Sequence, residues 1–351
     1  MLFGMWPGGP LGQFQSLSTA GYSTNVVSAS NAWLGKTNAI VNIFANETDL
    51  GELTTDLNNI WNGGSVPMLS YGPLLPTADI ANGDDEVEFE ALGKDISNYL
   101  ADGSGRKIYF RFMWEPNIGG NHNGLWSPCD SYGGQATAAD YIAAWRYVHS
   151  LFQTTFGFNS NDMQWVYSVG AGDSSCAAGA PPSTYPGNNY VDWVGIDYYP
   201  VFGQTSIPLT DNAVDGKTEW QELQAVAPGK PIGIDEAGVP DESPTSTYDP
   251  SGANKSTVIQ SYFNWAYNNG AGMLLWFNEW YPQEINSFSE LSSLQNLEYG
   301  VFDTDQGDDT FDSGTLDYKV WDGYKTAVNE YATGSTPSST GLITEAQFQG
   351  N

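Results

Sequence analysis

Residues 107–115 read KIYFRFMWE, and residues 231–238 read PIGIDEAG. Each stretch is a short apolar run, typical of a buried strand, with a glutamate where the run ends. Runs of this kind recur along the chain and alternate with longer amphipathic segments, which is the pattern of a parallel sheet whose strands are joined by helices. The expected strands are residues 2–6, 40–44, 66–71, 108–113, 164–169, 193–198, 232–235 and 273–277.

The segments between these strands have helical periodicity, clearest in residues 138–152, where apolar side chains recur three or four positions apart. The expected helices are residues 50–61, 89–100, 138–152, 218–226, 255–268 and 318–331. Eight strands alternating with helices predict one (β/α)8 TIM barrel over residues 1–333. A doubly wound sheet is the competing fold, but residues 8–10 (GGP) lack the G-x-G-x-x-G spacing of its phosphate loop.

The longest connections are residues 116–135, 171–189, 239–253 and 279–314. Each follows the C-terminal end of an expected strand, so we expect them to gather on one face of the barrel. Long loops on a single face generally line a cleft. Residues 334–351 begin with GSTPSSTG and are expected to form a linker-like tail, because the last ten are too few for another module.

The formal net charge is -30, from 11 Lys+Arg and 41 Asp+Glu among 351 residues. Nucleic acids and anionic membranes bind basic surfaces, so neither is an expected partner. The acidic residues are spread along the chain, which favours an acidic surface suited to a salt-rich or acidic habitat. No apolar run reaches the roughly 18 residues of a membrane span. Residues 1–6 lack the basic region of a signal peptide, so we expect a mature or truncated form of an extracellular, monomeric protein.

The cysteines and histidines are few. Cys129 and Cys176 both lie in Gly/Ser/Asp-rich segments, and either a disulfide between neighbouring loops or two free thiols fits them. With His122 and His149 far apart, no zinc-type spacing exists, so we expect no catalytic metal. Residues 303–312 are rich in aspartate, and we interpret them as a solvated loop, with bound calcium as the alternative.

Glu115 and Glu236 follow two different strands at their C-terminal ends, where barrel enzymes hold their active sites. Two carboxyl groups are what glycoside hydrolysis requires. One protonates the leaving oxygen, and the other attacks the anomeric carbon or directs water at it. The alternative, two ordinary salt-bridge partners at the barrel rim, explains one such glutamate more readily than both.

Several stretches also resemble the β-mannanase-type glycoside hydrolases of family 26, in the Glu/Glu barrel superfamily (clan A). They are residues 60–70 (IWNGGSVPMLS), 109–117 (YFRFMWEPN), 185–199 (YPGNNYVDWVGIDYY) and 230–238 (KPIGIDEAG), of which the third is the most specific. The matching stretches follow one another in the family's order between residues 60 and 280, whereas residues 1–59 match the family only loosely. It implies a retaining mechanism without an organic cofactor, in which Glu115 is the general acid/base and Glu236 the nucleophile.

The neighbours of the two glutamates suit these roles. Arg111 lies four residues before Glu115 on the same face of its strand, where its charge could keep the nucleophile ionised. Met113 and Trp114 are apolar, and apolar surroundings raise the pKa of a carboxyl that must donate a proton.

The resemblance implies further binding residues. The family has a tyrosine that hydrogen-bonds the nucleophile at the end of the sixth strand, which is Tyr198 or Tyr199 here. Alternation allows one of them to face inward, and the family's Asp-x-Tyr spacing favours Tyr199, with Asp197 in the same polar network. Aromatic rings bind the flat faces of sugars. The expected platform for the sugar at subsite −1 is Trp276, and the candidates for neighbouring subsites are Trp126 and Trp280.

The chain departs from the family at Trp114, where a histidine is usual. Asn117 follows Glu115 by two residues, while NGLW comes later, at residues 123–126. The resemblance implies that these positions contact the sugar at subsite −1, so the departure bears on which substrate is bound. β-1,4-Mannan is the leading polysaccharide substrate, and β-1,3-xylan and mixed-linkage β-glucan are the alternatives. Two rival classes are a non-catalytic carbohydrate-binding barrel and an acidic surface-layer protein.

Overall fold

The computed structural model describes residues 1–8, 24–84, 86–118, 125–129, 136–171, 176–200, 217–239, 253–278, 299–303, 307–314, 316–332 and 342–351. Eight strands close into a parallel barrel in sequence order, and β8 pairs with β1. They are β1 (Leu2–Trp6), β2 (Ile40–Ala45), β3 (Val66–Tyr71), β4 (Ile108–Phe112), β5 (Met163–Gly170), β6 (Trp193–Tyr198), β7 (Ile232–Ala237) and β8 (Met273–Phe277). The predicted (β/α)8 barrel is therefore confirmed.

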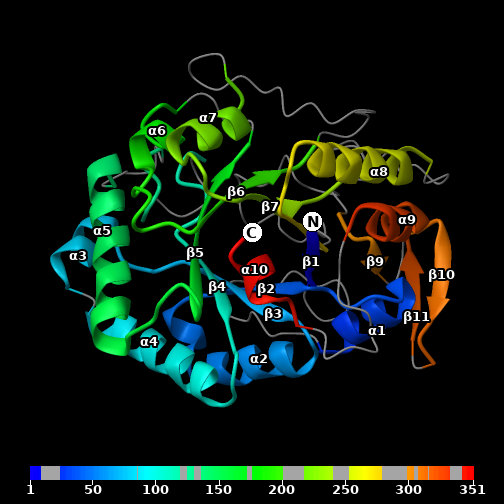
Figure 1. Cartoon of the computed structure of the whole chain (residues 1–351), viewed down its shortest axis with the longest axis horizontal. Coiled ribbons are helices and arrows are strands. Elements are labelled where there is room, and N and C mark those ends of the chain that lie inside the picture. Colours follow the sequence, from blue (N-terminus) through cyan, green and yellow to red (C-terminus); the bar gives the residue numbers. More distant parts are fainter. Residues whose placement is uncertain are drawn as a thin grey trace, which may run out of the picture.

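Helices surround the strands, as the view down the barrel shows (Figure 1). They are α1 (Thr24–Leu34), α2 (Leu50–Asn62), α3 (Thr77–Asn82), α4 (Glu86–Ala101), α5 (Ala138–Leu151), α6 (Pro181–Thr184), α7 (Glu219–Val226), α8 (Ala253–Asn268), α9 (Asp322–Tyr331) and α10 (Glu345–Phe348). Helix α9 packs against α8 and α1, so the last helix of the barrel meets the first. Helix α1 was missed because its Ser- and Asn-rich sequence has weak helix propensity, and packing of Val27, Trp33 and Leu34 stabilises it instead.

A small antiparallel sheet precedes α9, and the sequence did not predict it. Strand β11 (Asp317–Val320) pairs with β10 (Asp309–Asp312) and β9 (Phe302–Asp303). The helix expected over residues 318–331 is therefore a strand followed by the shorter α9. Tyr318 stacks on Phe302 with ring centroids 4.2 Å apart, and this cross-strand contact favours the sheet over a longer helix.

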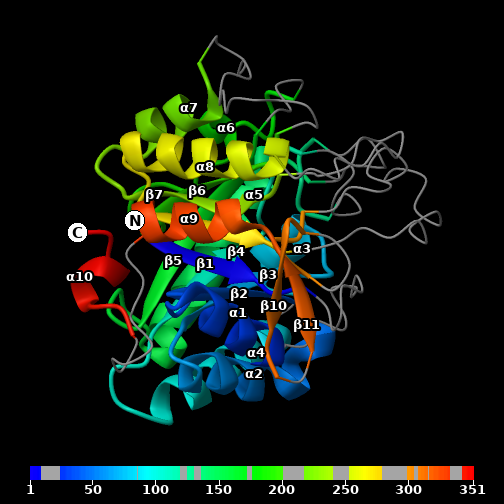
Figure 2. The same ribbon diagram turned by 90° about the vertical axis from the view of Figure 1, so that its right-hand side faces the viewer.

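Residues 342–351 cover the N-terminal end of the barrel. Helix α10 lies over the centre of the ring of strands in Figure 1 and at one end of the barrel in Figure 2. Phe348 is fully buried, and its carbonyl oxygen accepts hydrogen bonds from Trp193 Nε1 at 3.0 Å and Tyr109 Oη at 3.2 Å. These ten residues pack on the barrel rather than trail from it as expected, because they shield aromatic rings that face its open end. Residues 334–341 lie outside the described residues, and the division after residue 333 stays a prediction.

Candidate active site

Arg111, on β4, lies at the centre of a polar network inside the barrel. Its Nη1 donates to Glu236 Oε1 at 2.5 Å and to Ser70 Oγ at 3.1 Å, and its Nη2 pairs with Asp197 Oδ2. The Ser70 hydroxyl in turn donates to Asn42 Oδ1 at 2.9 Å. Burial alone would lower the pKa of Arg111, but the charges of Asp197 and Glu236 raise it by more, so the guanidinium stays positive. Because Arg111 is fully buried, it holds Glu236 and is not placed to contact a substrate.

Glu236 is brought inward by a β-bulge in β7. Ile196 of β6 pairs with Ile234 and Asp197 with Glu236, so Asp235 is the extra residue. A bulge of this kind changes which side chains face a sheet's two sides. It explains how the consecutive residues Asp235 and Glu236 both act on Arg111 inside the barrel. Simple alternation along residues 231–238 would place only one of them inward.

Both oxygens of Glu236 accept a hydrogen bond. Arg111 binds Oε1, and the hydroxyl of Tyr199 donates to Oε2 at 2.6 Å. Donors at both oxygens hold the orientation of a carboxyl. Of the two tyrosines considered from the sequence, Tyr199 is the one that reaches Glu236. Tyr198 packs edge-on against Tyr262 of α8, on the outside of the barrel, with ring centroids 5.8 Å apart.

Glu115 lies just after β4, with a backbone φ of 54°. Its N–H donates to the carbonyl oxygen of Ser168 on β5 at 3.0 Å. Its Oε1 lies close to Gly170, at the end of β5: a Cβ added to Gly170 would be 3.0 Å from Glu115 Oε1. Gly170 pairs with Asp197, and Asp197 pairs with Glu236. The two glutamates therefore lie at the same C-terminal end of the barrel.

Asp197 lies close to both glutamates. Burial is the main influence raising its pKa; Arg111 opposes this, while Glu236 and Glu115 add to it. Asp197 Oδ1 also accepts a hydrogen bond from Ser168 Oγ at 3.2 Å. The polar network expected around Asp197 is thus present, but the side chain is buried within it.

Trp114 packs over the network. Its ring lies 5.4 Å from Arg111 Cζ and contacts the rings of Phe44 and Trp126 at 5.2 and 5.4 Å. Trp126 Nε1 donates to the carbonyl oxygen of Trp114 at 2.9 Å. A cation over the face of a tryptophan is attracted by the ring's quadrupole. The residue that departs from the family pattern therefore contacts the arginine that holds Glu236.

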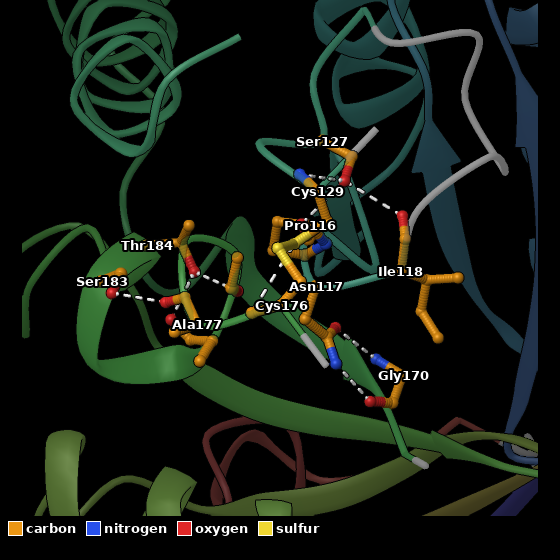
Figure 3. The surroundings of a disulfide bond; sticks show 12 residues. Pro116, Asn117, Ile118, Ser127, Cys129, Gly170, Cys176, Ala177, Ser183 and Thr184 are labelled. Carbon is orange, nitrogen blue, oxygen red and sulfur yellow. Dashed lines mark hydrogen bonds between the residues drawn. A yellow bond between two sulfur atoms is a disulfide. The ribbon is translucent and has the colours of Figure 1, made fainter. Parts of the chain in front are cut away.

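Asn117 ties the segment after Glu115 to β5 (Figure 3). Its Oδ1 accepts from Gly170 N at 2.9 Å, and its Nδ2 donates to Gly170 O at 2.6 Å. Cys129 and Cys176 form a disulfide with their Cα atoms 5.6 Å apart, which joins the same two loops. Asn117 is buried, so its amide supports the position of Glu115 and does not serve as the substrate contact that was expected.

Trp276 is not the expected sugar platform. It is fully buried on the outer face of β8, where its ring contacts Tyr324 of α9 at 5.3 Å and its Nε1 donates to Tyr299 O at 2.8 Å. Met273 and Leu275 belong to the cluster inside the barrel, so alternation directs Phe277 to the inside of the barrel and Trp276 to the outside. Trp280 lies outside the described residues.

Sequence reasoning missed three aromatic residues at this end of the barrel. Trp6 stacks on Phe277 with centroids 4.4 Å apart and meets Phe44 edge-on at 5.4 Å. Phe44 also contacts Trp114, so these four rings form one aromatic wall: Trp6, Phe44, Trp114 and Phe277. The sequence feature that could have identified these three residues is an aromatic side chain at the last inward-facing position of each of the strands β1, β2 and β8.

Within the described ranges, no three His, Cys, Asp or Glu side chains are grouped so that they could hold a metal ion. The same part of the chain contains no helix with the length and apolar character of a membrane span. Part of the acidic stretch 303–312 lies outside the described residues.

Two curated relatives match the sequence, and no protein-family model does. A mannan endo-1,4-β-mannosidase of Caldalkalibacillus mannanilyticus is 26% identical over 314 residues, covering 81% of this chain and 55% of the relative. Endoglucanase H of Acetivibrio thermocellus is 29% identical over 164 residues, covering 46% of this chain and 17% of the relative. The chain thus spans about half of the first protein's length and a smaller part of the second.

Solved structures resemble the whole chain. The catalytic domain of a family 26 endo-β-1,4-mannanase of a Bacillus species superposes with a TM-score of 0.60 at 16% identity, covering 100% of this chain and 89% of that one. A β-mannanase from a symbiotic protist of the termite Reticulitermes speratus gives 0.52 at 14% identity, covering 99% and 89%. The fold of this chain is therefore that of the family 26 glycoside hydrolases, the family that its motifs resemble.

Proposed function

We propose that this protein is a retaining glycoside hydrolase that cleaves internal β-linkages of a plant-type polysaccharide, with β-1,4-mannan as its substrate. The observation that carries the proposal is Glu236, whose two oxygens are bound by Arg111 and Tyr199 at the barrel end that also holds Glu115. The relative that covers most of the chain is named as a mannan endo-1,4-β-mannosidase, which supports mannan over the alternatives.

In this reaction Glu236 attacks the anomeric carbon while Glu115 gives a proton to the glycosidic oxygen, and the bond between sugar and leaving group breaks. The product is a glycosyl ester of Glu236. Glu115, now a base, takes a proton from water, and the resulting attack releases the sugar with its configuration retained. A retaining pair requires carboxyl groups about 5–5.5 Å apart. Arg111 and Tyr199 hold the carboxyl of the nucleophile in place before the attack.

The first test is a product profile on mannan, galactomannan, β-1,3-xylan and mixed-linkage β-glucan. Short manno-oligosaccharides are expected from wild type and none from Glu236→Ala, because that variant lacks the nucleophile. If products appear from xylan alone or from glucan alone, that polymer and not mannan is the substrate. Binding without products would favour the non-catalytic carbohydrate-binding barrel, and neither binding nor products would favour the surface-layer class.

The role of Glu115 is tested with two leaving groups. Glu115→Ala is expected to lose activity on mannan by about 10²–10⁴-fold, the usual contribution of general acid catalysis. It should lose far less on a dinitrophenyl β-mannoside, whose leaving group departs without a proton. Equal loss on both substrates would contradict the acid/base assignment.

We also propose that the protein acts outside the cell as a monomer with an acidic surface adapted to salt. The disulfide between Cys129 and Cys176 supports an oxidising compartment. The net charge of -30 supports both solubility without a partner and tolerance of salt. Light scattering in low and high salt tests the monomer, and a mass of two chains or more would contradict it.

A further inference from the structure

We infer that Asp235 is a positioning residue that must stay protonated beneath Glu236, and that its ionisation limits activity on the alkaline side. The inference rests on the proposed function for its kinetic part, whereas its structural part can be tested without activity. Neither the hydrolytic reaction nor the binding of a sugar at Glu236 requires a carboxyl at this position.

The barrel provides a closed space for the Asp235 side chain. Asp235 is 1% exposed and lies opposite Gly195 of β6. A methyl group on Gly195 would overlap the Asp235 carboxyl, and one on Gly233 would be 3.2 Å from its Oδ1. Glycine at both positions therefore leaves the room that the carboxyl fills.

The charges around Asp235 do not favour its ionised form. From β4 it faces Arg111 and Tyr109, from β6 Asp197, and along β7 Glu236. The one guanidinium already pairs with Asp197 and Glu236. With all three carboxyls ionised, this buried group would carry a net charge of about −2, whereas a neutral Asp235 reduces it to about −1.

The hydrogen bonds lead to the same conclusion. Among the described residues, neither oxygen of Asp235 has a hydrogen-bond partner. The Ser168 hydroxyl is close enough to lower the pKa of Asp235, but its single proton is directed to Asp197 Oδ1 at 3.2 Å. A protonated Asp235 can donate to the free lone pair of Ser168 Oγ, and an ionised one cannot. A buried carboxylate without donors is strongly disfavoured.

These influences together raise the pKa of Asp235 from its ordinary 3.8 to about 6, with burial as the largest cause. Arg111 and Ser168 lower the pKa, and Glu236 raises it. Above this pH, an ionised Asp235 would compete with Glu236 for Arg111. The nucleophile would then lose the contact that orients it, although no group touching the substrate had changed.

The kinetic test compares wild type with Asp235→Asn on a dinitrophenyl β-mannoside, using kcat/KM from pH 4 to 9. This substrate removes the need for a protonated Glu115, so an alkaline decline cannot come from the general acid. Above the pH at which Asp235 ionises, the kcat/KM of wild type is expected to fall about tenfold per pH unit, as a single ionisation requires. Asp235→Asn should match wild type at pH 5 and stay flat to higher pH.

The structural test measures the melting temperature of the same proteins against pH. The folded-state pKa lies above the unfolded one, so the folded protein binds more protons between about pH 4 and 6. Wild-type stability must fall as pH rises through this window, while the asparagine variant lacks that loss. The variant's melting temperature relative to wild type should therefore increase with pH, whether or not any substrate is hydrolysed.

Asp56→Asn is the matched control. Asp56, on α2, also has a pKa raised to about 6, by burial and then by Glu52 and Asp49, but it lies on an outer helix. It should change the pH dependence of stability and leave the alkaline limit of kcat/KM in place. If Asp235→Asn does not fold, Asp235→Ala serves the same comparison.

Three results would overturn the inference. If the alkaline decline in kcat/KM persists in Asp235→Asn, the ionisation of another group causes it. A more than tenfold loss at pH 5 would mean that a neutral side chain of the same shape cannot replace the carboxyl. A melting-temperature difference independent of pH would show that Asp235 is not protonated in the folded state. Absence of hydrolysis by wild type would refute the proposed function and leave the melting test decisive for Asp235.

Discussion

At the scale of single residues, one cation organises the site. Arg111 binds Glu236 and Asp197, and Ser70 and Asn42 extend the network to β3 and β2. The position of Arg111, four residues before Glu115, was a usable signal because side chains alternate along a strand. The two polar residues Asn42 and Ser70 were not recognised, although polar side chains within apolar strands are unusual.

The contact between Tyr199 and Glu236 gives a prediction at this scale. Tyr199→Phe removes one of the two donors to the carboxylate, and hydrogen bonds to charged groups contribute about 1.5–3 kcal/mol. We expect kcat/KM to fall by about ten- to a hundredfold, with little change in stability. Steady-state kinetics on mannan and thermal unfolding measure the two effects.

The matched control is Tyr99→Phe, which removes a buried hydroxyl bonded to Lys107 O at 2.9 Å, beside the N-terminal end of β4. It should cost stability and leave kcat/KM within about twofold, because the hydroxyl has no contact with the site. Equal activity in Tyr199→Phe and wild type would contradict the importance of the Tyr199 hydrogen bond.

At the scale of elements, the loops after β4 and β5 form one connected unit. Asn117 bonds both backbone groups of Gly170, and Ser127 Oγ donates to Pro116 O at 2.9 Å. A Cβ on Gly179 would overlap Pro116 and Cys129, so the two segments approach closely. Glu115 is therefore held from two sides, by the strand before it and by this unit after it.

The disulfide between Cys129 and Cys176 gives the prediction at this scale. It joins positions 47 residues apart, and removing such a crosslink frees the unfolded chain. We expect the double Cys→Ser variant to lose about 2–4 kcal/mol in the free energy of unfolding, measured by urea denaturation. Activity at 25 °C should fall less, because the Asn117 bonds to Gly170 remain. Unchanged unfolding on reduction of wild type would refute the stabilising role.

At the scale of the whole molecule, the barrel has one end that holds the polar candidate site and an apolar end closed by residues 342–351. Lys107 pairs with Glu345 at 2.6 Å, beside the buried Phe348, so charge and packing both hold α10 in place. Figure 2 shows α10 at one end of the barrel. The candidate site and α10 lie at opposite ends of the barrel, which separates the residues that close the core from those proposed for catalysis.

The net charge gives the prediction at this scale. Self-repulsion among 41 acidic residues acts over a Debye length of about 30 Å at 0.01 M salt but about 3 Å at 1 M. We expect the melting temperature and the activity to rise as NaCl increases over this range. Sucrose at matched osmolality is the control, since it screens no charge. Indifference to salt would count against the halophilic adaptation.

The sequence by itself determined the barrel, because each strand is recognisable from its own apolar run and its neighbours. It also placed Glu115 and Glu236 at the ends of strands, which locates both on the loop-bearing face of any such barrel. The choice of Tyr199 over Tyr198 required the alternation of side chains along a strand together with the family's Asp-x-Tyr spacing.

Only the tertiary structure decided which way other side chains point. The bulge at Asp235 depends on pairing between β6 and β7, and the outward position of Trp276 depends on the register of β8 and on packing against α9. The closure of the barrel by Phe348 joins residues that are distant in sequence. These features arise from contacts between separate elements, and local periodicity carries no information about such contacts.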